Sequence, residues 1–139
     1  METEEVKYAT LKRTLLLMIP VVIIGGFIYS YNKQENGIDE KLCECSFYTI
    51  ASPFEMFNSH KFRFSFYYKG KHYTRYERVG AGDLGLSYSQ SDVLHHRFLI
   101  RVNCEDVGIF RFNWKVKVPD SLQNIPANGW TTLPSFAEK

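Results

Sequence analysis

The feature that most constrains this chain is an uncharged run from Thr14 to Tyr31, close to its first residue. The run reads Thr-Leu-Leu-Leu-Met-Ile-Pro-Val-Val-Ile-Ile-Gly-Gly-Phe-Ile-Tyr-Ser-Tyr and contains no acidic or basic side chain. As a helix it spans about 27 Å, close to the roughly 30 Å hydrocarbon core of a bilayer. We therefore predict a transmembrane helix over residues 14–31 that contacts membrane lipid.

The residues that flank this run fit the same prediction. Lys12 and Arg13 precede it, while Tyr29 and Lys33 lie at its other end, as in an interfacial belt of aromatic and cationic side chains. A helix buried in a soluble core and a cleaved signal peptide are the two alternatives. The run is longer than a usual signal core and no small-x-small cleavage site follows it, so we favour an uncleaved signal anchor.

The distribution of basic residues predicts the orientation of the anchor. Lys7, Lys12 and Arg13 precede the run, and Lys33 and Lys41 follow it. Because basic residues concentrate on the cytoplasmic side, this order predicts a cytoplasmic N-terminus and an extracytoplasmic C-terminal domain. The alternative is a cytoplasmic domain with reduced thiols.

The chain divides into five parts at its changes of composition. With 139 residues in total, about 108 follow the anchor, which is enough for one domain with a modest core. The predicted parts are a polar N-terminal segment (1–13), the anchor (14–31), a polar linker (32–41), a β-rich soluble domain (42–119) and an extended C-terminal tail (120–139).

Alternation of apolar and polar side chains predicts strands after the anchor. Phe62, Phe64 and Phe66 alternate with polar or amphipathic residues. Lys69-Gly-Lys71 then predicts a tight turn, so residues 72–79 should return as the second arm of a hairpin. Residues 97–102 form another alternating segment.

The clearest strand covers residues 110–118. Its apolar face is followed by Pro119, which cannot continue a ladder of hydrogen bonds. Residues 43–50 are a further strand candidate, and residues 53–59 are a candidate for one turn of helix. In the tail, Trp130 is the large apolar residue expected to hold the segment against the sheet. These patterns, with 16% aromatic residues, predict a mainly β domain: an antiparallel sheet or a small, partly open barrel.

The three cysteines allow one disulfide. Cys104 could pair with either Cys43 or Cys45, which we expect on the same face of a strand, and the pattern does not choose between them. A Cys-x-Cys metal site with His95 or His96 is the alternative, although adjacent histidines on a strand point to opposite faces. Buried cysteines that pack as small hydrophobic side chains, or one structural disulfide, are both favoured over a metal site, and we predict neither a metal nor a cofactor.

The segment from Gly80 to Ser91 is rich in glycine and serine and is predicted to be a mobile loop. Gly80-Ala-Gly-Asp-Leu-Gly85 has the G-x-G-x-x-G spacing, but it is followed by a poor helix start and lies in no βαβ pattern. A membrane-anchored enzyme or metal-binding protein would use this region, whose polar residues are Asp83, Asp92, His95 and His96. No nucleophile has a recognisable catalytic setting, so the sequence favours a non-enzyme.

The predicted hairpin carries cations and aromatic residues together. We take Arg63, Tyr67, Lys69, Lys71 and Arg75 as the candidate partner-binding residues. Such a surface could stack on nucleotides or glycans or contact another protein, although a charged face that protects the sheet from aggregation has the same composition. A formal net charge of +2 argues against nucleic acid as the partner.

The order of motifs resembles a loose group of small membrane-anchored β-domain proteins of unknown function. The resemblance rests on Tyr67-Tyr-Lys-Gly-Lys-His-Tyr73, Arg97-Phe-Leu-Ile-Arg-Val102, the Val118-Pro-Asp-Ser-Leu ending and Pro126-Ala-Asn-Gly-Trp130. Asn103-Cys-Glu-Asp106 departs from it, because those proteins often have a proline-rich turn there. The resemblance implies an N-terminal transmembrane helix and a compact β-domain, but no catalytic residues.

Together these observations predict a single-pass membrane protein. Its β-domain would act as a binding or accessory module for a protein partner at the extracytoplasmic membrane surface.

Overall fold

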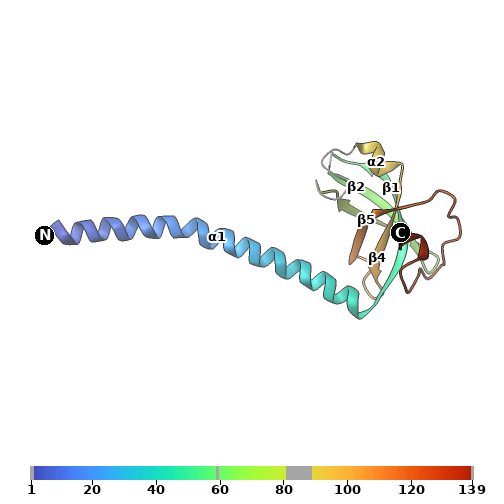
Figure 1. Ribbon diagram of the computed structural model, residues 1–139, viewed down its shortest axis with the longest axis horizontal. Helices are drawn as coiled ribbons and strands as arrows, with labels where there is room; N and C mark the ends of the chain where they lie inside the picture. The colour runs from blue at the N-terminus through green and yellow to red at the C-terminus, as the bar shows by residue number, and fades with distance from the viewer. Residues whose placement is uncertain (1, 59, 81–88, 139) are drawn as a thin grey trace. The chain divides into compact units, whose positions relative to one another are not determined.

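The computed structural model describes residues 2–58, 60–80 and 89–138 of the chain, and it consists of one long helix and a β-domain (Figure 1). Helix α1 covers Glu2–Glu44. The strands are β1 (Ser46–Met56), β2 (Lys61–Tyr68), β3 (Lys71–Arg78), β4 (Arg97–Asn103) and β5 (Phe110–Val118), with α2 (Gln90–Leu94) and the 3-10 helix η1 (Ser135–Ala137) outside the sheet. The contacts separate residues 1–39 from residues 40–139.

Helix α1 is long and apolar enough to cross a membrane. Every side chain from Thr14 to Tyr31 is exposed, so the uncharged run is not buried within its own unit of the described residues. An exposed apolar surface of this length requires an apolar environment, which a bilayer provides. The chain therefore fits a single-pass membrane protein.

The linker expected at residues 32–41 is helical, because α1 continues to Glu44. Its asparagine, glycine and charged residues suggested an irregular segment, but they do not end the helix. The helix ends where β4 side chains satisfy its last carbonyls: Asn103 Nδ2 donates to Lys41 O at 2.7 Å and Arg101 Nη2 donates to Leu42 O at 2.8 Å.

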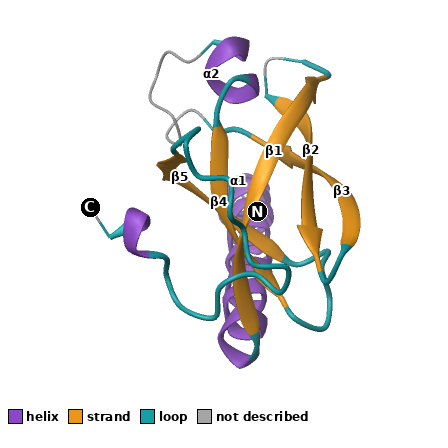
Figure 2. Cartoon of the chain, turned by 90° about the vertical axis from the view of Figure 1, so that its right-hand side faces the viewer, coloured by secondary structure: helices purple, strands orange, loops and turns teal. Residues whose placement is uncertain are grey.

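The sheet has five antiparallel strands in the order β3-β2-β1-β4-β5 (Figure 2). One of its faces is an aromatic core, in which Phe62, Phe64 and Phe66 are buried. Phe64 of β2 packs edge to face on Phe112 of β5, with ring centroids 4.8 Å apart. The strands β1 and β4 lie between β2 and β5 in the sheet. The sheet is therefore strongly curved, and it remains open because β3 and β5 are not neighbours in its strand order. The mainly β fold is confirmed.

The β2–β3 hairpin has the predicted two-residue turn. Lys69 and Gly70 have φ values of 50° and 73°, as expected when both central residues of a tight hairpin turn are left-handed. The strand expected at residues 43–50 is present from Ser46 onward as part of β1. The helical turn expected at residues 53–59 was wrong, because residues 53–56 also belong to β1. Alternating burial along β1 outweighed the local preference of Pro53 for a turn.

The C-terminal tail lies against the sheet through Trp130, as predicted. Tyr48 N donates to Trp130 O at 2.7 Å and Trp130 N donates to Tyr48 O at 2.8 Å, so the two residues form an isolated β-bridge. A turn closed by the Gly129 N–H and Pro126 O leads into this bridge. Gly129 has a φ of 69°, and a Cβ placed there would lie 2.5 Å from Tyr48 O.

We expect Gly129→Ala to detach the tail, because the added methyl group overlaps the Tyr48 carbonyl that the bridge uses. Hydrogen exchange at the Tyr48 and Trp130 amides measures this loss of protection. Gly70→Ala is the matched control, since its φ is 73° but its Cβ would meet no atom within 4 Å. Both variants incur about 1 kcal/mol of backbone strain, and only Gly129→Ala should lose the bridge. Equal protection in the two variants would contradict the role assigned to Gly129.

Asn103 connects the end of α1 to the β4–β5 loop. Its side chain is 5% exposed and makes four hydrogen bonds. The amide nitrogen donates to the carbonyls of Lys41 and Cys45, and the oxygen accepts from the backbone N–H groups of Glu105 and Asp106. All four bonding positions of this amide are used.

Asn103→Asp should destabilise the domain by on the order of 3 kcal/mol, because it removes both donors and places carboxylate oxygens against two carbonyls. Thermal unfolding of the full chain in detergent, followed by near-ultraviolet circular dichroism, measures the effect. Asn124→Asp makes the same chemical change at an exposed tail residue and should alter stability by less than about 0.5 kcal/mol. Similar melting curves for the two variants would show that the Asn103 bonds contribute little.

Candidate functional site

The candidate site is a cluster of rings and cations on the outer face of the sheet, opposite the aromatic core. We call it the aromatic–cation surface, and its members are Phe54, Phe57, Lys61, Arg63, Tyr76 and Arg78. They come from β1, β2, β3 and the start of the β1–β2 connection.

The register of the strands explains why these side chains meet. Arg63 is paired with Tyr76, and Lys61 is paired with Arg78, so the four side chains share one face. Alternation places that face opposite Phe62 and Phe64 of the core. The β1–β2 pairing shifts between Pro53 and Glu55, which leaves Phe54 as the extra residue of a bulge. Bulges redirect a side chain, and the Phe54 ring lies 6.0 Å from the Arg63 guanidinium.

Arg63 is the centre of the surface. Its Nη2 donates to the Tyr76 hydroxyl at 2.6 Å, and its Nη1 lies 2.9 Å from Glu55 Oε2. The guanidinium also lies over the rings of Tyr76 and Phe57, at 5.0 Å and 5.2 Å from their centroids. Its Nε is buried and makes no hydrogen bond with the described residues. Arg63 is therefore held in place, and it positions the rings around it.

The rings of this surface are half exposed despite these contacts. Phe54 is 51% exposed, Phe57 48% and Tyr76 49%, and Phe57 and Tyr76 pack with their ring centroids 5.5 Å apart. Large exposed aromatic residues beside an arginine are the composition that dominates binding energy at protein interfaces. The arrangement is suited to binding; it contains no nucleophile beside a base.

The structure separates the binding residues expected from the sequence. Arg63 and Tyr67 share the outer face, but Tyr67 packs on His72 near the hairpin turn, with centroids 4.9 Å apart. Arg75 pairs with Phe64, which places it on the core face, where it lies over the Tyr73 ring and donates to Thr74 O.

Lys69 is in the turn itself and Lys71 pairs with Tyr68, so neither belongs to the Arg63 cluster. The expectation of one continuous surface was therefore wrong, because it treated the hairpin as a single face.

Phe54, Phe57 and Tyr76 were missed by the sequence reasoning. Tyr76 could have been found from the sequence by counting residue pairs along the two hairpin arms, outward from the Lys69-Gly70 turn. This count places Tyr76 opposite Arg63. The two phenylalanines follow from the bulge and the end of β1, for which the sequence carries no clear signal.

The cysteines form the pair Cys45–Cys104, with Cα atoms 5.5 Å apart, and Cys43 is an exposed free thiol. The expectation that Cys43 and Cys45 share a strand face was wrong, because Cys43 is in the last turn of α1 and Cys45 is in the bend that follows. Because Cys45 is in a disulfide, its sulfur cannot act as a thiolate ligand in the alternative Cys-x-Cys metal site. Among the described residues, no three His, Cys, Asp or Glu side chains are grouped as a metal would require.

The region of the alternative enzyme site lies partly outside the described residues, which include neither Asp83 nor most of the G-x-G-x-x-G segment. After the residues that are not described, Ser89 and Asp92 form a capping box that begins α2, so the poor helix start expected after the glycines does begin a short helix.

The capping box also affects the charge of Asp92. The Ser89 backbone N–H bonds to the Asp92 carboxylate at 2.7 Å and lowers the pKa of that group below its ordinary value of 3.8. His95 and His96 lie at the end of α2 rather than on a strand, and their Nδ1 atoms lie about 3 Å from the carbonyls of Ser91 and Asp92.

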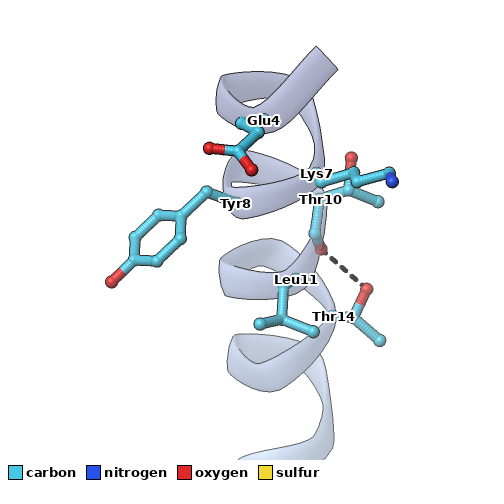
Figure 3. Close-up of a pocket in the computed structure, with 6 residues that line it drawn as sticks. All are labelled: Glu4, Lys7, Tyr8, Thr10, Leu11 and Thr14. Carbon is cyan, nitrogen blue, oxygen red and sulfur yellow. Dashed lines mark hydrogen bonds between the residues drawn. The ribbon is translucent and has the colours of Figure 1, made fainter. Parts of the chain in front are cut away.

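A surface depression on α1 offers no enclosed site. It is lined by Glu4, Lys7, Tyr8, Thr10, Leu11 and Thr14, all from one helix (Figure 3). Figure 3 shows these side chains extending outward from the helix, with the Thr14 hydroxyl donating to Thr10 O. Because all of its lining residues come from α1, the depression is the space between side chains of one exposed helix.

A second groove, of about 360 Å³, lies between the tail and the outer face of β1 and β2. Ile125 and Pro126 of the tail form one side of it, and Ser52 and Ser65 contribute hydroxyl groups. It contains no charged side chain.

Comparisons of the chain with protein-family models, curated proteins and solved structures found no match. The resemblance to small membrane-anchored β-domain proteins is therefore still a prediction.

Proposed function

We propose that this chain is a membrane-anchored binding module that presents the aromatic–cation surface to a protein partner on the extracytoplasmic side of the membrane. The observation that carries the proposal is the cluster of half-exposed rings fixed around Arg63. A surface of this kind loses contact with water when a partner packs on it, and its preorganised rings lose little conformational entropy in doing so.

The extracytoplasmic placement is supported by the cysteines and by the basic residues before the anchor. Cys45 and Cys104 form a disulfide, and disulfides persist in oxidising compartments. The basic residues that precede Thr14 predict the same orientation. The anchor would then keep the module at the membrane surface, where a tethered partner has a high effective concentration.

The orientation is tested with the exposed Cys43 thiol. A membrane-impermeant maleimide should label the full chain in cells whose plasma membrane is intact, and it should not label the Cys43→Ser variant. Labelling that requires permeabilisation of the plasma membrane would place the domain in the cytoplasm.

The binding surface is tested by photocrosslinking in cells. A benzophenone amino acid at position 57 should give a specific protein adduct. The same group at position 67, a control on the outer face with 62% exposure, should not. Tyr76→Ser should weaken the binding that the position-57 adduct reports by about thirtyfold, since truncation of a central aromatic residue costs about 2 kcal/mol at such interfaces. An adduct from position 67 alone would move the contact to the hairpin turn and contradict the proposal.

A further inference from the structure

The charges on the aromatic–cation surface define the chemistry of its partner. Lys61 and Arg78 are directly paired across β2 and β3, so two like charges face one another on the outer face. Such a pair is destabilising without an anion. No carboxylate of the described residues lies within 4.0 Å of the Lys61 ammonium or the Arg78 guanidinium. The ion pair on this surface joins Arg63 to Glu55 instead.

The neighbouring charges leave a net positive surface. Lys61, Arg63 and Arg78 contribute three cations, and Glu55 neutralises Arg63. Lys61 is held over the Tyr76 ring, with its Nζ 5.1 Å from the centroid, so its ammonium group is placed beside the exposed apolar area. A ligand that covers the rings therefore meets Lys61 and Arg78 as it does so.

We propose that the partner is an acidic, apolar segment of a protein. Its apolar side chains would cover Phe57 and Tyr76, and its carboxylates would pair with Lys61 and Arg78. This inference rests on the proposed function and specifies the chemistry of the ligand.

The packing of the rings favours a protein over an anionic lipid surface. Residues that insert into a bilayer project from the protein, whereas here the Phe57 and Tyr76 rings pack on one another and on Arg63, with about half of each covered. They form a platform, and platforms bind by close packing against a complementary surface.

The charge requirement is tested with the purified full chain in detergent and with three labelled synthetic peptides of equal length. One peptide combines glutamate and aspartate with leucine and phenylalanine, a second has the same acidic residues with serine, and a third combines lysine with the same apolar residues. Fluorescence anisotropy should show binding of the first peptide at least about tenfold tighter than of the other two, because only that peptide satisfies both the rings and the cations. Raising the salt from about 0.05 M to about 0.5 M should weaken the binding several-fold.

The double variant Lys61→Glu/Arg78→Glu should bind the first peptide at least about tenfold more weakly than the wild type. Lys69→Glu/Lys71→Glu changes the net charge equally at the hairpin turn, and its affinity should stay within about twofold of the wild type. Near-ultraviolet circular dichroism of both variants verifies that the fold is retained; if the charge reversals unfold the chain, Lys61→Gln/Arg78→Gln replaces them. Equal weakening by the two pairs, or equal binding of the lysine and acidic peptides, would overturn the inference.

Two further outcomes identify where a failure lies. Binding to phosphatidylserine vesicles that depends on Lys61 and Arg78, with no binding of the acidic, apolar peptide, would overturn a protein partner in favour of lipid. A photoadduct from position 57 that is unchanged by Lys61→Glu/Arg78→Glu would overturn the acidic chemistry while leaving the proposed function intact. Absence of that adduct in the wild type would instead contradict the proposed function itself.

Discussion

The β-domain depends on the connection between the last turn of α1 and the end of β4. Asn103 and Arg101 donate to the final helix carbonyls, and Cys104 is bonded to Cys45 directly beyond the helix. A disulfide with a sequence separation of 59 lowers the entropy of the unfolded chain by an amount equivalent to about 4 kcal/mol. This connection fixes where β1 begins. Since β1 is the central strand, it also fixes the position of the other four.

The curvature of the sheet separates two kinds of surface. The inner face buries Phe62 and Phe64 against the rings of β5, and it buries Phe66 beside Phe64; these contacts need no polar partner. The outer face of the same hairpin must remain soluble, and its rings are accompanied by cations that lie over them. The aromatic residues of the inner face therefore stabilise the domain, and those of the outer face would serve the proposed binding. The position of each residue in the alternation decides to which face it belongs.

The separation of the helix from the domain also has a functional meaning. The exposed apolar run is long and apolar enough to cross a membrane, whereas the domain has its own core and its own disulfide. A module of this kind needs the membrane for location rather than for folding of its β-sheet. Its action would then depend on which partners are concentrated at the same surface.

The sequence by itself determined the features that depend on local patterns. An uncharged run of membrane length, alternation in residues 62–66 and 110–118, the Lys69-Gly70 turn and the Trp130 contact were all predictable, because each depends on neighbours along the chain. The continuation of α1 to Glu44 was not predictable, because the last carbonyls of the helix bond to side chains about 60 residues away along the chain.

Only the tertiary structure decided the disulfide and the candidate site. Cys43 and Cys45 are equivalent by spacing, and the end of α1 distinguishes them by placing Cys45 beside Cys104. Of the five binding residues expected from the sequence, Arg63 alone belongs to the aromatic–cation surface. The pairing of β2 with β3, which the Lys69-Gly70 turn fixes, adds Tyr76 and Arg78 to the surface. The bulge that adds Phe54 depends on contacts between β1 and β2 that local composition does not encode.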